Sequence, residues 1–162
     1  MKRVLITGGA RGIGRAMVEY FSARGDEVVF IYRQNEDAAK TLSAQTGARA
    51  VRADLSDAIE AARAAAEAEA LVGGVDVLVN NAVMAQIKLF TDLSDEEWRR
   101  MIDTNLSSAF YVSRAIAKGM IARQSGRIIN VGSMWGKVGA SCEVHYSASK
   151  AGLRGLTMAL AK

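Results

Sequence analysis

The stretch VLITGGARGIG (Val4–Gly14) joins a short apolar run to a glycine-rich turn near the start of this 162-residue chain. The apolar residues Ala16, Met17 and Phe21 that follow have helical spacing, so the stretch predicts a strand, a tight loop and a helix in this order. The first turn of such a helix offers free N–H groups and the positive end of its dipole to a pyrophosphate. The stretch therefore predicts a nucleotide-binding unit. The simpler alternative is a strand-to-helix turn whose glycines are needed only for positive φ.

The glycine spacing in this turn differs from the common GxGxxG pattern, because three residues separate the first two glycines and one separates the last two. Glycine at such positions lets the backbone approach the phosphates and lets the helix pack close to the strand. The residues that we expect to contact the cofactor here are Gly8, Arg11, Gly12, Ile13 and Gly14.

Short apolar runs alternate with helical patterns along the rest of the chain. The predicted strands lie near residues 3–7, 27–32, 48–52, 75–80 and 126–132. The predicted helices lie near residues 13–24, 35–45, 56–71, 95–123 and 145–162, and Ser94 with Glu97 forms a capping box for the fourth helix. This alternation predicts an α/β protein with a Rossmann-type, doubly wound parallel sheet. Ligands bind such sheets at the strand C-termini, and we expect the crevice between strands one and four.

Composition limits the classes of function. The net charge of +4 is spread along the chain without a basic run, so we expect no nucleic-acid partner. No apolar run reaches membrane-spanning length and no signal-peptide pattern is present, so we expect no membrane partner and a cytoplasmic location. The single Cys142 excludes an internal disulfide and suits a reducing compartment. We also expect no metal site.

Tyr146 and Lys150 are four residues apart in a predicted helix and therefore share one face. An ammonium group held beside a phenol favours the phenolate, which makes the hydroxyl a better proton donor near neutral pH. Ser133, just upstream, can hold a substrate oxygen beside that hydroxyl. The pair recurs by chance in helices, so its weight comes from its combination with the glycine-rich turn.

Five motifs in this order resemble those of the classical short-chain dehydrogenase/reductase family, over the whole chain. They are Thr7–Gly14, Asp54 in Ala53-Asp54-Leu55-Ser56, Asn80-Asn81-Ala82-Val83, Asn105 in Asp103-Thr104-Asn105-Leu106, and Ser133 with Tyr146 and Lys150. The resemblance implies that Asp54 contacts the adenine and that Asn81 and Ala82 line the cofactor site.

The resemblance also implies the catalytic roles. Tyr146 would donate a proton to the substrate carbonyl, and Ser133 would donate a hydrogen bond to it. Lys150 would assist Tyr146 and bind the nicotinamide ribose. Asn105 would anchor a water that resupplies protons through Lys150; the alternative is a buried amide bonded to backbone.

Two features depart from the family pattern. Val83 stands where the family usually has glycine, and a β-branched residue tolerates positive φ poorly, so we expect strain or crowding of the cofactor there. The chain also ends at Lys162, within the predicted catalytic helix. Family members continue for roughly half as much again, so we expect residues 1–162 to be a single, incomplete domain with strands one to five only. We further expect this chain to be marginally stable and weakly active.

The end of strand two indicates the cofactor. An NAD site usually has an acidic residue there to bind the ribose 2′-hydroxyl, whereas this chain has Tyr32-Arg33-Gln34. The guanidinium of Arg33, helped by Arg11, suits a 2′-phosphate. We therefore expect NADP(H) rather than NAD(H).

Within the family, the chain resembles bacterial 3-oxoacyl-acyl-carrier-protein reductases. The implied function is NADPH-dependent reduction of a ketone, on a small molecule or a carrier protein, by a homodimer or homotetramer at full length. One alternative is a reductase of the 5-aminopentanone group on elongation factor P, which the stretches Trp135-Gly136 and Gly139–Val144 resemble; Glu143 would suit a cationic amine. The other alternative is an inactive nucleotide-binding fragment.

Overall fold

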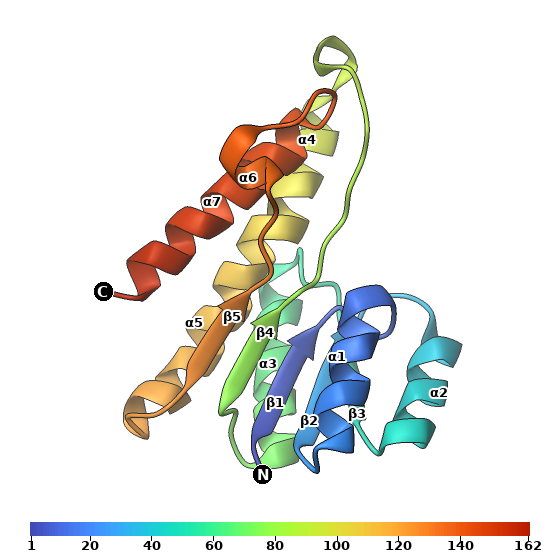
Figure 1. The fold of residues 1–162 in the computed structure, drawn as a ribbon, viewed down its shortest axis with the longest axis vertical. Helices are drawn as coiled ribbons and strands as arrows, with labels where there is room; N and C mark the ends of the chain where they lie inside the picture. Colours follow the sequence, from blue (N-terminus) through green and yellow to red (C-terminus); the bar gives the residue numbers. More distant parts are fainter.

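The computed structural model of this protein describes residues 1–162 and contains one five-stranded parallel sheet in the order β3-β2-β1-β4-β5 (Figure 1). The strands are β1 (Arg3–Thr7), β2 (Glu27–Tyr32), β3 (Arg49–Arg52), β4 (Val77–Asn80) and β5 (Arg127–Asn130). Leu5 at the centre of β1 lies opposite Val29 of β2 and Leu78 of β4. The strand order reverses between β1 and β4, so the predicted switch point is confirmed.

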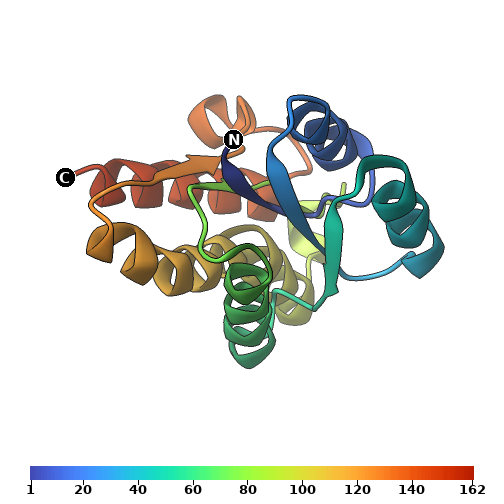
Figure 2. The same cartoon turned by 90° about the horizontal axis from the view of Figure 1, so that it is seen from below.

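Helices cover both faces of the sheet (Figure 2). They are α1 (Gly12–Ala23), α2 (Glu36–Thr46), α3 (Ala58–Val72), α4 (Asp95–Ile102), α5 (Ser108–Ala122), α6 (Trp135–Val138) and α7 (Val144–Leu160). On one face, Val4 and Phe30 pack with α1 and α2 in one buried cluster. On the other face, Leu5 and Val29 pack with α3 and α5 in a second cluster. Alternate residues of β1 therefore pack into the clusters on opposite faces of the sheet, as expected of strands buried on both faces. None of the helices combines the length and the apolar character needed to cross a membrane.

The helix predicted over residues 95–123 is divided by a π-helical segment, η2 (Asp103–Ser107), between α4 and α5. In η2, Ser108 donates its N–H to the carbonyl of Asp103, five residues back. Such segments often occur at functional sites, and this one contains the buried Asn105. The predicted capping box at Ser94 and Glu97 is confirmed.

The region after β5 differs from the prediction. The strand ends at Asn130, so Ser133 lies in a loop three residues beyond it. The N–H of Val131 still donates to the carbonyl of Asn80 in β4. The carbonyl of Val131, however, accepts a hydrogen bond from the ammonium of Lys150 and none from a neighbouring strand. The short helix α6 and the 3₁₀ turn η1 (Phe90–Asp92) were not predicted, since segments of three or four residues carry no periodic signal.

Candidate active site

A crevice of about 770 Å³ opens at the C-terminal ends of β1, β2 and β4. This volume is typical of small-molecule sites. Its walls contain every residue expected to bind the cofactor other than Tyr146 and Lys150: Gly8, Arg11, Gly12, Ile13, Gly14, Arg33, Asp54, Asn81 and Ala82. The structure thus brings together residues from four separate stretches of the chain.

The glycine-rich turn presents the start of α1 to this crevice. Arg11 at the N-cap has extended backbone and makes no side-chain cap, and the first turn of α1 has no acidic residue. The first N–H groups of the helix are therefore available to an anion. Gly14 makes this geometry possible, because a Cβ atom there would lie 2.1 Å from the carbonyl oxygen of Gly8 and 2.7 Å from Nδ2 of Asn81.

The Asn80-Asn81-Ala82 motif ties the end of β4 to the glycine-rich turn. Oγ1 of Thr7 accepts the N–H groups of Asn81 and Ala82, both at 3.0 Å. Nδ2 of Asn81 donates to the carbonyls of Thr7 and Gly8, at 3.0 and 3.3 Å. The amide of Asn81 thus holds the turn in shape, in addition to lining the crevice.

Two arginines, Arg33 and Arg100, and the carboxylate of Asp54 lie at the end of the crevice formed by β2 and β3. Nε of Arg33 lies 3.4 Å from Oδ2 of Asp54, and each side chain is more than a third exposed. Burial raises the pKa of Asp54. Hydrogen bonds from Ser56 and the charges of Arg33 and Arg100 lower this pKa by more than burial raises it, so the net shift is downward. Arg100, on α4, also lines the crevice. Arg100 could not be predicted as a site residue, because only the tertiary fold brings α4 over this end of the sheet.

The backbone strain expected at Val83 is absent. Its φ is not positive, unlike that of Asn35, Gln124 and Cys142. The Val83 side chain is 42% exposed and forms part of the crevice wall. The expectation of an unfavourable backbone conformation was therefore wrong, since the chain passes this point in an ordinary conformation that valine can adopt.

Tyr146 and Lys150 lie together in the first half of α7. Nζ of Lys150 is 5.9 Å from the centroid of the Tyr146 ring. Lys150 is only 4% exposed, and burial lowers its pKa. Its ammonium donates a hydrogen bond of 2.7 Å to the carbonyl of Val131, just beyond β5. The cation is therefore held at a defined place beside the phenol.

Ser133 lies in the loop between β5 and α6. Its Oγ accepts the N–H of Trp135 at 3.2 Å, so the hydroxyl proton stays available to a substrate oxygen. Helix α6 packs directly on α7, because a Cβ atom at Gly136 would lie 2.7 Å from the carbonyl carbon of Lys150. Gly136 thereby permits the close contact that brings this loop to the catalytic helix.

The side-chain amide of Asn105 is committed to backbone. Its Oδ1 accepts the N–H of Met84 at 2.8 Å, and its Nδ2 donates to the carbonyl of Met84 at 2.9 Å. Nδ2 also lies 3.3 Å from Oγ of Ser149 on α7. Asn105 thus links the crevice wall to the catalytic helix, in agreement with the alternative of a buried amide bonded to backbone.

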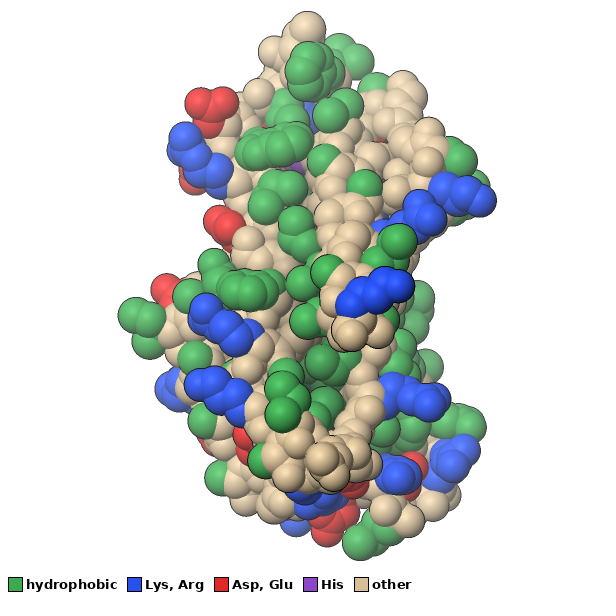
Figure 3. All heavy atoms as spheres, turned by 90° about the vertical axis from the view of Figure 1, so that its left-hand side faces the viewer, with side chains coloured by type: hydrophobic (Ala, Val, Ile, Leu, Met, Phe, Trp, Pro, Cys, Tyr) green, Lys and Arg blue, Asp and Glu red, His purple; other side chains and the backbone are tan.

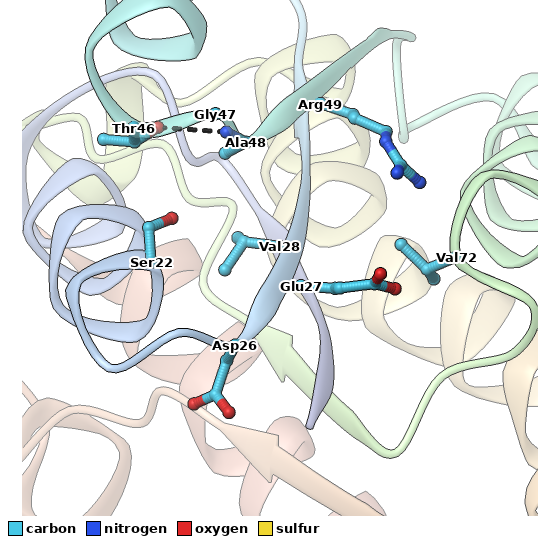
Figure 4. A pocket seen from close by; sticks show the side chains of 9 residues that line it. All are labelled: Ser22, Asp26, Glu27, Val28, Thr46, Gly47, Ala48, Arg49 and Val72. Atoms are coloured by element: carbon cyan, nitrogen blue, oxygen red, sulfur yellow. Dashed lines mark hydrogen bonds between the residues drawn. The ribbon is translucent and has the colours of Figure 1, made fainter. Parts of the chain in front are cut away.

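A second hollow, of about 140 Å³, lies at the opposite ends of β2 and β3 (Figure 4). Its lining includes Asp26, Glu27 and Arg49, and a hydrogen bond joins Thr46 to Ala48 at its edge. None of the expected site residues lies there. The larger crevice is therefore the candidate active site.

Comparison with known proteins gives consistent matches. Residues 2–162 match the protein family described as short chain dehydrogenase. Over 163 aligned residues, the chain is 40% identical to the acetoacetyl-CoA reductase of Shinella zoogloeoides, covering 100% of this chain and 68% of that protein. It is 38% identical to the 3-oxoacyl-[acyl-carrier-protein] reductase FabG of Escherichia coli (strain K12), covering 99% of this chain and 66% of that protein. The chain thus spans about two thirds of the length of these relatives.

Proposed function

Because the chain belongs to the short-chain dehydrogenase family, we propose that it carries the cofactor site and catalytic residues of an NADPH-dependent reductase of 3-oxoacyl thioesters. Membership places it among oxidoreductases that act on alcohol and carbonyl groups. The observation that carries the proposal is the single crevice where the glycine-rich turn and the Asn81 motif meet, joined through Met84 and Asn105 to the helix of Tyr146.

The residues present fit a nicotinamide dinucleotide. The free N–H groups of α1 and the guanidinium of Arg11 suit the pyrophosphate, and Asp54 suits the adenine end. When bound, the reduced nicotinamide supplies hydride to the carbonyl carbon. The hydroxyl of Tyr146 donates a proton to the carbonyl oxygen, and Ser133 donates a hydrogen bond to the same oxygen. The ammonium of Lys150 stabilises the tyrosinate that remains.

We propose NADPH over NADH because Arg33 stands at the end of β2 and no carboxylate follows it there. Arg33 pairs with Asp54, and a 2′-phosphate would compete for this guanidinium. Titration of both cofactors by fluorescence tests the preference in the wild type, in Arg33→Asp and in the exposed, unpaired control Arg154→Asp. Hydrogen bonds to charged groups contribute about 1.5–3 kcal/mol, so Arg33→Asp should cost roughly ten- to a hundredfold in NADPH affinity. Equal affinity of the wild type for the two cofactors would contradict the proposal.

The 3-oxoacyl thioester substrate is supported by the relatives, whose names specify acetoacetyl-CoA and 3-oxoacyl groups on acyl-carrier protein. The test is kcat/KM for acetoacetyl-CoA and for a 3-oxoacyl carrier protein, with NADPH. Absence of turnover together with intact NADPH binding would favour the inactive-fragment hypothesis.

A specific observation favours the aminoketone alternative. Glu143, three residues before Tyr146, is half-buried and makes no ion pair or side-chain hydrogen bond. It follows Cys142, whose backbone has a φ of 59°, a conformation uncommon outside glycine and often associated with functional loops. A free carboxylate at this place suits a cationic amine. A higher kcat/KM on 5-aminopentanone-modified elongation factor P, lost in Glu143→Gln, would replace the thioester assignment.

We also propose that the full-length protein acts as a homodimer or homotetramer in the cytoplasm. Apolar side chains gather along the middle of the face seen in Figure 3, with most basic side chains toward its margins. Exposed apolar residues of β5, α5 and α7 include Ile129, Phe110, Ile121 and Met158. Light scattering after size exclusion measures the assembly directly, and a monomer at micromolar concentration would contradict it.

A further inference from the structure

An extended segment, residues 81–89, connects β4 to η1 without pairing with another strand (Figure 1). Its alternate residues Met84, Gln86 and Lys88 are half-buried, whereas Ala85 and Ile87 between them are exposed. The inward side chains therefore attach this segment to the helices beside it.

Gln86 connects two helices through its side-chain amide. Its Nε2 donates to Oε1 of Glu97 on α4 at 2.7 Å, and its Oε1 lies 3.2 Å from Nε2 of His145 on α7. Nζ of Lys88 also binds both carboxylate oxygens of Glu97, at 2.7 Å. His145 is only 1% exposed and directly precedes Tyr146. These residues come from three separate segments, so only the tertiary structure brings them together.

The direction of these hydrogen bonds follows from the charge of Glu97. Hydrogen bonds from Lys88, the Ser94 backbone and Gln86 lower the pKa of Glu97 to about 2, so it is ionised at neutral pH and can only accept. The Gln86 amide nitrogen must therefore face Glu97, and its oxygen must face His145. The imidazole then carries its proton on Nε2. Nδ1, which has no partner, carries none.

Within the first turn of α7, the other side-chain hydrogen bond is local: Oγ of Ser147 accepts the N–H of Ala140, seven residues before it, at 3.1 Å. Glu143 at the N-cap makes no side-chain hydrogen bond to the first turn, so the orientation of that turn depends on its neighbours. His145 is the buried polar side chain of that turn, and Tyr146 follows it directly.

We propose that Gln86 is a positioning residue, which holds His145 as the neutral Nε2–H tautomer and so fixes the first turn of α7 for proton donation by Tyr146. The catalytic part of this inference rests on the proposed reductase function. The charged groups that face His145 are Glu97 and Glu143, which raise its pKa, and Lys88, which lowers it; burial is the largest influence and makes the net shift downward.

The chain contains a single histidine, so ¹⁵N NMR reports on His145 without ambiguity. The expected wild-type result is the Nε2–H tautomer, neutral down to a pH below the usual imidazole pKa of about 6.5. Gln86→Met keeps the side-chain length but removes both hydrogen bonds, and should give mixed tautomers. The matched control is Gln45→Met on the exposed surface of α2. It removes the hydrogen bond that Arg15 of α1 donates to Gln45. A wild-type Nδ1–H tautomer, or an unchanged spectrum in Gln86→Met, would overturn the proposal, whether or not the protein reduces ketones.

Activity provides the second readout. In Gln86→Met, kcat should fall by about tenfold or more with NADPH affinity unchanged, because small misplacements of a catalytic group are costly. Gln86→Asn keeps an amide that can donate to Glu97 and accept from His145, although it is one methylene shorter, and should retain more of kcat than Gln86→Met. If kcat falls equally in both variants, or if NADPH affinity falls together with kcat, Gln86 has a general structural role and the proposed positioning role is rejected. Normal His145 spectra without any wild-type turnover would instead reject the reductase function.

Discussion

The two strands β1 and β2 inside the sheet differ from the edge strand β5 in how completely they are buried. In β1 and β2 the central residues, such as Leu5 and Phe30, are fully buried, and they pack against helices on both faces. In β5 only alternate residues are even partly buried, and Ile129 is 40% exposed. The cofactor half, β1 to β3 with α1 and α2, is therefore held mainly by apolar packing.

The catalytic half, β5 with α6 and α7, is held largely by hydrogen bonds from polar side chains. Lys150 donates to the carbonyl of Val131, Nδ2 of Asn105 donates to Oγ of Ser149 on α7, and Nδ2 of Asn130 donates to Oγ1 of Thr157. Hydrogen bonds of this kind fix direction more than they add stability. The comparison therefore indicates that changes in the cofactor half should affect folding and ligand binding, whereas changes in the catalytic half should affect turnover.

The largest effect should come from Tyr146→Phe, which removes the proton donor and keeps the ring in place. General acid catalysis contributes about 10²–10⁴-fold, so kcat should fall by that factor. NADPH affinity should stay nearly unchanged, because the glycine-rich turn lies in the other half. Steady-state kinetics and cofactor titration measure the two quantities. A Phe variant with a substantial fraction of wild-type kcat would show that another group is the acid.

The second largest effect should come from Gly14→Ala, which should lower both the stability of the cofactor half and its affinity for NADPH. Its Cβ would lie 2.1 Å from a backbone oxygen, so the loop must move. Overpacking costs about 1–3 kcal/mol, and NADPH binding should weaken with it. Thermal unfolding with and without NADPH measures both effects.

The matched control for Gly14→Ala is Gly155→Ala on α7, where no atom lies within 4 Å of the added Cβ. It should stabilise the helix by up to about 1 kcal/mol. Equal destabilisation by the two substitutions would show that the halves do not differ as described.

Gly136→Ala should act mainly on turnover. A Cβ there meets the Lys150 backbone, so α6 must shift and move Ser133 away from Tyr146. We expect kcat to fall by about tenfold, with a smaller loss of stability than for Gly14→Ala, since a four-residue helix moves more easily than a loop enclosed between strands. Gly132→Ala, with open space around its Cβ, is the control. Similar kcat values in the two variants would argue against the role given to the α6–α7 contact.

The smallest effect concerns acid stability. The hydrogen bond from Arg3 lowers the pKa of Asp76 to about 2, against opposing burial. Because the folded pKa lies below the unfolded value, this carboxylate stabilises the fold above about pH 4 and loses its contribution as the pH falls toward 2. The contribution is of order 2 kcal/mol at most.

Urea unfolding of Asp76→Asn between pH 7 and pH 2.5 measures this contribution, with the exposed and unpaired Asp37→Asn as control. The two variants should differ in stability at pH 7 and converge at low pH. A constant difference across this range would show that the ion pair is not the cause.

The local sequence was sufficient to predict the cofactor half. Its signals lie among neighbours in sequence: the apolar runs of β1 and β2 and the three spaced glycines. The structure reproduces these elements closely. The capping box at Ser94, outside this half, is a local signal of the same kind. The family resemblance then supplied the order of the site residues. The structure places all the predicted cofactor-loop residues in one crevice.

Only the tertiary structure decided the details of the catalytic half. The π-helical segment at Asn105, the loop position of Ser133, the ordinary backbone of Val83 and the link from Gln86 to His145 each depend on contacts between segments far apart in sequence. Helix and strand patterns report which side of an element is apolar. They do not report where a buried amide or ammonium finds its partner, because that partner is set by how the finished elements pack.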